Sequence, residues 1–149
     1  MADRPSSDPP APARRPPGVS DELVEAVGKV SEALEYVERA RGHLFSFHQL
    51  MGHADLVFGE AADQLEAAGQ PGDADHLRAE LVGRNVIDGR WTFQIVEEFD
   101  ATYWQVARDL EGRARGLTGG TRHVLESEMK ERRRSAGRRH HEQRPDPGA

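Results

Sequence analysis

The chain has 149 residues, a net charge of −6 and no cysteine. This length suits a single domain, and the lack of thiols excludes disulfides, thiolate metal sites and cysteine nucleophiles. The acidic residues are concentrated in residues 21–117, which disfavours nucleic acid and anionic membranes as partners. Neither an apolar leader segment nor an apolar run of roughly 18 residues is present, so we expect a cytoplasmic protein outside the membrane.

Residues 1–19 are rich in proline and poor in large apolar side chains, which predicts a disordered arm. Ser20 followed by Asp21 and Glu22 indicates the start of a helix, because a hydroxyl caps free backbone N–H groups and acids favour the positive end of the helix dipole. An apolar residue then recurs every seventh position, which predicts a helix over residues 21–68 that is about 70 Å long. The members of this row are Leu23, Val30, Val37, Leu44, Met51, Phe58 and Leu65.

A second row on the same helix is small and apolar, and consists of Ala26, Ala33, Ala40, Phe47, Ala54 and Ala61. Small side chains let another helix approach closely. We expect either the C-terminal helix or a second copy of the chain to cover this row, and we favour a homodimer.

Three further helices are predicted. Residues 70–72 form a turn, after which Asp73 caps a short helix carrying Leu77 and Leu81. A turn at Asp88-Gly89 precedes a helix over residues 91–116, and residues 118–136 form an amphipathic C-terminal helix. The inner face of the helix over 91–116 is predicted to contain Val96, Phe99, Tyr103, Val106 and Leu110.

These elements predict an all-α fold, a long antiparallel helical hairpin or small helical bundle with disordered N- and C-terminal tails. Residues 20–117 form the helical domain, residues 118–136 the C-terminal helix, and residues 137–149 a disordered basic tail. The sustained heptads are also typical of a coiled coil.

A polar seam is the main candidate for a site. Arg41, His48 and Asp55 follow one another every seven residues on the stripe that otherwise carries small or apolar side chains. Buried polar groups need partners, and antiparallel pairing of the helices places Asp100 near Arg41 and Arg84 near Asp55. We therefore predict these two pairs, with His48 hydrogen-bonded near residues 91–95.

Metal binding and catalysis have weak support in the sequence. His48 and Asp55 share a helix face but lie about 10 Å apart along the axis, so they are weak metal candidates and we expect no cofactor. The chain contains neither a His-Glu-x-x-His motif nor a phosphate-binding glycine loop. We expect a protein that is not an enzyme.

Two surfaces are candidate partner sites. Trp104, next to Glu97 at the edge of the third helix, could anchor a protein partner. The C-terminal segment is basic and could contact phosphates, although interspersed acids and the lack of aromatic residues weaken that hypothesis. Its basic residues are Lys130, Arg132, Arg133, Arg134, Arg138 and Arg139.

Three segments, residues 45–55, 85–100 and 126–134, resemble those of a family of small uncharacterised actinobacterial helical proteins. The resemblance implies a bacterial cytoplasmic setting and assigns no catalytic residues. The sequence as a whole favours a non-enzymatic interaction or regulatory module that acts through its helical surface on a protein partner. The alternatives are a bundle that binds a metal or small ligand at the polar seam, and a nucleic-acid-associated protein that uses the basic tail.

Overall fold

The computed structural model describes residues 15–120 and 123–141, and most of these residues are helical. Contacts divide the chain into two units. We call residues 34–109 the hairpin unit, and residues 1–33 together with 110–149 the terminal unit. The predicted all-α class is confirmed, because the described residues contain helices, one isolated β-bridge and no strand.

Helix α1 runs without interruption from Asp21 to Ala67, close to the predicted 21–68. Its start is capped as expected, since the Ser20 hydroxyl accepts a hydrogen bond from the Leu23 N–H at 3.2 Å. Gly42 and Gly52 lie within the helix and do not break it. Gly28 and Gly59 also lie within it, so the heptad pattern outweighs the lower helix propensity of four glycines.

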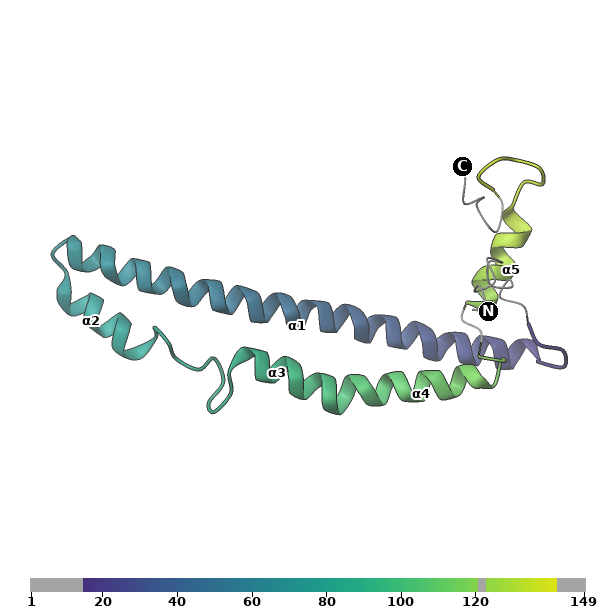
Figure 1. Ribbon diagram of the computed structural model, residues 1–149, viewed down its shortest axis with the longest axis horizontal. Helices are drawn as coiled ribbons and strands as arrows, with labels where there is room; N and C mark the ends of the chain where they lie inside the picture. Colours follow the sequence, from purple (N-terminus) through teal and green to yellow (C-terminus); the bar gives the residue numbers. More distant parts are fainter. Residues whose placement is uncertain (1–14, 121–122, 142–149) are drawn as a thin grey trace, which may run out of the picture. The chain divides into compact units, whose positions relative to one another are not determined.

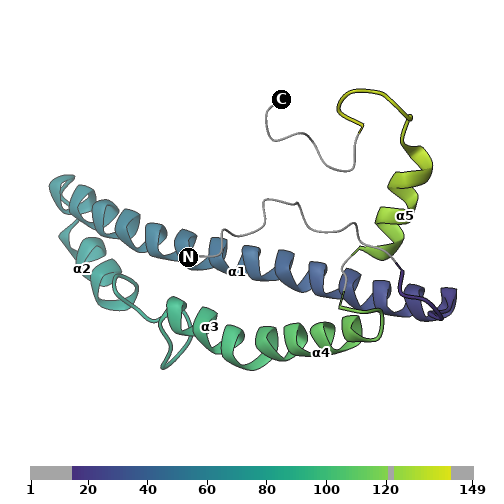
Figure 2. The same cartoon turned by 45° about the vertical axis from the view of Figure 1, so that its right-hand side comes forward.

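The hairpin unit forms when the chain reverses at Gly69, which adopts a positive φ of +79°. Helix α2 (Pro71–Glu80) and then helix α3 (Thr92–Phe99) run back beside α1, as Figures 1 and 2 show. The prediction that Asp73 caps α2 is wrong. Pro71 occupies the first turn and Gln70 is the cap residue, because proline lacks the N–H that the first turn leaves unpaired.

The connection between α2 and α3 is not helical. Its predicted turn at Asp88-Gly89 is confirmed: the Arg90 N–H donates to the Ile87 carbonyl at 3.0 Å, and these two residues form the isolated bridge. The connection leaves that part of α1 without a helix packed against it. This gap shapes the cavity described below.

A π-helical turn, η1 (Asp100–Trp104), joins α3 to α4 (Gln105–Gly116). A π turn holds one residue more than an α turn and so shifts the inward-facing positions by one residue. The inner face predicted from Tyr103, Val106 and Leu110 is therefore wrong, and these side chains are 60%, 53% and 58% exposed. The residues that turn inward are instead each one position later: Trp104 and Ala107 are half-buried, and Glu111 is buried.

The terminal unit contains the start of α1, the end of α4 and helix α5 (Val124–Arg133). Val24, Val27 and Val124 are buried there, and Leu125 lies against Gly28. The sequence predicts that residues 15–19 belong to the disordered arm, whereas in the structure Arg15 donates two hydrogen bonds to the Glu128 carboxylate, at 3.0 and 3.1 Å. The remainder of that arm, residues 1–14, and the tail end, residues 142–149, lie outside the described residues.

The buried Glu111 carboxylate also belongs to the terminal unit. It accepts a hydrogen bond from the Ser31 hydroxyl at 2.9 Å and lies 3.4 Å from the Arg115 guanidinium. Paired in this way, the carboxylate meets the requirement that a buried charge has partners. Among the helices of the described ranges, none has an apolar stretch long enough to cross a membrane.

The π turn predicts an unusual tolerance to deletion. Removing the exposed Thr102 should convert η1 into a regular α turn and leave Trp104 facing α1, with the melting temperature within about 5 °C of the parent. Removing the exposed Gln49 from the regular part of α1 should instead rotate Asp55 by about 100° away from its partner and unfold the hairpin unit. Circular dichroism melting curves of both variants would test this, and equal destabilisation would contradict it.

Candidate functional site

Arg41 and Asp100 form the centre of the polar seam in the hairpin unit. The Arg41 Nε and Nη2 atoms donate to the two Asp100 carboxylate oxygens at 2.7 and 2.9 Å. The two side chains are 25% and 26% exposed, so the pair is largely shielded from water. The predicted pairing is confirmed, in the bidentate geometry that arginine and carboxylate groups favour.

Trp104 completes this cluster. The Arg41 guanidinium lies 4.0 Å from the centre of the Trp104 ring, and the indole Nε1 donates to a Glu38 carboxylate oxygen at 2.9 Å. The Arg108 guanidinium lies 4.6 Å from the same ring. These contacts leave the half-buried indole little surface to offer a partner, whereas its neighbour Glu97 is exposed.

The ion pair changes the acid–base properties of both groups. The hydrogen bonds from Arg41 hold the pKa of Asp100 below its usual range, and partial desolvation opposes this effect. The same hydrogen bonds raise the pKa of Arg41. Both groups of the pair therefore stay ionised near neutral pH, and the pair holds α1 and η1 together.

His48, the second seam residue, lies where the sequence predicted. Its Nδ1 atom is 2.7 Å from the Thr92 hydroxyl at the start of α3. The ring is half-buried. A hydrogen-bonded structural histidine accounts for this geometry.

Asp55, the third seam residue, caps the connection between α2 and α3. One of its carboxylate oxygens accepts a hydrogen bond from the Gly83 N–H at 2.7 Å. Arg84 is the next residue but does not pair with Asp55. Its guanidinium donates to the Glu80 carbonyl at 3.3 Å, so the expected proximity is present and the contact is made by the backbone instead.

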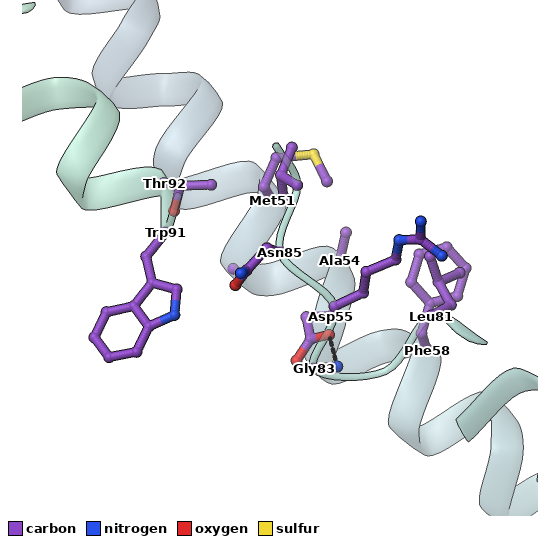
Figure 3. Close-up of a pocket in the computed structure, with 12 residues that line it drawn as sticks. Met51, Ala54, Asp55, Phe58, Leu81, Gly83, Asn85, Trp91 and Thr92 are labelled. Carbon is purple, nitrogen blue, oxygen red and sulfur yellow. Dashed lines mark hydrogen bonds between the residues drawn. The ribbon is translucent and has the colours of Figure 1, made fainter. Parts of the chain in front are cut away.

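A cavity of about 450 Å³ lies between α1 and this connection. Figure 3 shows Met51, Ala54 and Phe58 of α1 facing Leu81 and Asn85, with the Asp55 to Gly83 hydrogen bond at its rim. Arg84 and Trp91 also line it. Its size falls within the range of small-molecule sites, and its walls combine apolar and polar groups as such sites do.

The metal candidates do not gather into a ligand set. His48 bonds to Thr92 and Asp55 bonds to the Gly83 backbone, and the part of the chain that the structure describes holds no cluster of three or more metal-binding side chains. These two residues thus serve the packing of α1 against the returning chain.

A second strip of α1 faces away from the seam. We call it the outer row, and its positions alternate in steps of three and four residues, about 100–160° around the helix from the nearest of Arg41, His48 and Asp55. Its larger side chains are strongly exposed: Tyr36 61%, Leu50 67% and Val57 45%, with Phe47 at 37%. Within the hairpin unit the outer row comprises Tyr36, Ala40, His43, Phe47, Leu50, Ala54, Val57 and Ala61, of which Ala54 also lines the cavity.

Sequence reasoning found only the alanine and phenylalanine half of this row. The missing half consists of Tyr36, Leu50 and Val57. These residues are also spaced by multiples of seven, and each lies four residues before an alanine of the first half. Two interleaved heptad rows with steps of three and four are the signal of a complete helix-binding face.

The basic C-terminal candidates are divided between α5 and the segment after it. Lys130, Arg132 and Arg133 lie in the last turn of α5, where cations complement the helix dipole. Arg134 forms an ion pair with Glu131. Arg138 and Arg139 are exposed. Residues 123–141 contain no Phe, Tyr or Trp that could stack on a base beside them.

Comparisons with models of protein families, with curated proteins and with solved structures found no match for this chain. The resemblance to an actinobacterial family stays a prediction.

The lowered pKa of Asp100 predicts how the stability of the fold changes as the pH falls. Because its folded pKa is lowered, the pair stabilises the fold above the unfolded pKa of about 4, and this contribution is lost as the pH falls toward the lower folded pKa. Asp100→Asn should lower the melting temperature at pH 7 and flatten its decline between about pH 5 and pH 2. The exposed Asp109→Asn is the matched control and should keep the parent profile. An Asp100→Asn profile parallel to the parent would contradict this assignment.

Proposed function

We propose that this protein is a non-enzymatic helical interaction module that binds a partner helix through the outer row of α1. The observation that carries the proposal is the exposure of large apolar side chains along one regular strip, from Tyr36 to Val57. Exposed apolar patches that follow a helix face are typical of protein interaction surfaces. The lack of cysteine fits a reducing compartment, so the proposal places the protein in the cytoplasm.

The polar seam supports this reading by what it does inside the hairpin unit. The side chains of Arg41, His48 and Asp55 each form a hydrogen bond with the chain that returns along α1. The seam thereby fixes which face of α1 turns inward. It leaves the outer row, which carries no ion pair or hydrogen bond of its own with the returning chain, as the surface available to a partner.

Site-specific photo-crosslinking tests the proposal. A benzophenone amino acid at Leu50 should give discrete covalent adducts in cells that produce the protein, because Leu50 is the most exposed large side chain of the outer row. The same group at Gln49, one residue away and about 100° around the helix, is the matched control. Equal labelling at both positions, or none at Leu50, would overturn the proposal.

The cavity supports a second candidate function, the binding of a small amphiphilic anion. Its apolar walls and the adjacent Arg84 guanidinium suit a ligand with an apolar body and an anionic group. This candidate replaces the seam itself as a ligand site, because the seam side chains are already engaged.

Titration with anilinonaphthalene sulfonate, an apolar anion that fluoresces when bound, probes this cavity. Arg84→Gln should weaken its binding about fivefold or more, as the loss of a charge-assisted contact predicts. The exposed Arg113→Gln should leave the affinity unchanged. An Arg84→Gln variant that binds the dye as tightly as the parent would exclude this cavity as an anion site.

A further inference from the structure

We infer that the occupant of the outer row is a second copy of this chain, with the two α1 helices packed antiparallel about a two-fold axis between Phe47 and Leu50. This inference rests on the proposed function, because it names the partner of the same surface. It is carried by two independent properties of the described residues, the sizes of the side chains and the positions of the charges.

The sizes of the outer-row side chains complement one another only when the helices run in opposite directions. An antiparallel pairing that places Phe47 opposite Leu50 of the second copy also places Tyr36 opposite Ala61 and Ala40 opposite Val57. Each large side chain then meets a small one or packs beside the axis, as close-packed helix interfaces require. A parallel pairing would set Tyr36 against Tyr36 and leave Ala54 facing Ala54.

The charges beside the outer row favour the same direction. Arg39 and Glu60 flank it on its polar edge, both are exposed, and no ion pair within the described residues involves either one. In the antiparallel arrangement Arg39 of each copy lies within two residues of the level of Glu60 in the other, which creates two opposite-charge contacts. In a parallel arrangement residues of this one edge would lie on opposite sides of the interface, so Arg39 and Glu60 would form no such contacts.

The outer row by itself covers about half of the area that a stable interface buries on each partner. The outer row from Tyr36 to Ala61 is about 38 Å long, and a helix is about 10 Å wide, so the strip covers roughly 400 Å². A stable interface buries about 800 Å² on each partner. The next row around α1 adds the half-buried Leu44, together with Phe58, which is 37% exposed, and Met51, although these last two also line the cavity. An isologous contact of this kind closes on itself as a dimer.

Cysteine pairing can read the direction of the helices, because the chain has no cysteine of its own. Full-length Tyr36→Cys and Ala61→Cys proteins should each remain uncrosslinked with a short bismaleimide, since like positions lie about 38 Å apart along an antiparallel pair. A mixture of the two proteins should give a covalent dimer. A covalent dimer formed by either protein alone would show a parallel pair and overturn the inference.

A second experiment reverses the charges that are inferred to meet across the dimer. In sedimentation velocity, Arg39→Glu should weaken dimerisation about tenfold or more, and adding Glu60→Arg to the same chain should restore it, because the swapped pair is again opposite in charge. The exposed Glu35→Arg, which lies off the outer row, should leave the dimer unchanged. A parent protein that is monomeric at about 100 μM would overturn the inference. Adducts to other proteins from Leu50 would in that case still support the interaction module, so the two failures are distinguishable.

Discussion

The bidentate pair between Arg41 and Asp100, covered by the Trp104 ring, is the contact on which the hairpin unit depends. It joins the middle of α1 to the π turn, 59 residues later in the chain. An arginine on an apolar stripe is costly unless its donors are used and its charge is balanced. Asp100 meets both requirements, and Glu38 adds a second nearby negative charge.

The π turn is best understood through this pair. A regular α-helix over residues 92–116 would turn Tyr103 and Val106 toward α1. The extra residue in η1 instead brings Asp100 and Trp104 to the same guanidinium. Because π turns are less stable than α turns, they persist where a specific contact outweighs their cost. The Arg41 cluster is such a contact, and Tyr103 and Val106 are exposed as its consequence.

A two-layer helical hairpin can bury only one side of each helix. The other side of α1 therefore stays exposed, and the proposed function assigns it to a partner. The seam lies on the inward side of α1, where its polar groups are hydrogen-bonded to the returning chain. The outward side retains an apolar strip that contains both large and small side chains, spaced in steps of three and four residues. Such a strip lowers its free energy by packing against another helix. The same chain offers a complementary strip when it is turned end for end.

The sequence by itself determined the long helices and the partners of two of the three seam residues, Arg41 and His48. The seven-residue period predicted the extent of α1 to within one residue, and antiparallel pairing of α1 with the third helix predicted that Arg41 meets Asp100 and His48 meets the start of α3. These features follow from local periodicity and from a chain reversal that the sequence predicted at residues 70–72, close to the observed reversal at Gly69. Tertiary structure alone decided the inner face beyond Asp100, because a π turn is stabilised by a distant arginine and leaves no local signal. It also decided that Asp55 binds the Gly83 backbone instead of Arg84. The path of an irregular connection depends on the packing around it, which no periodic pattern encodes.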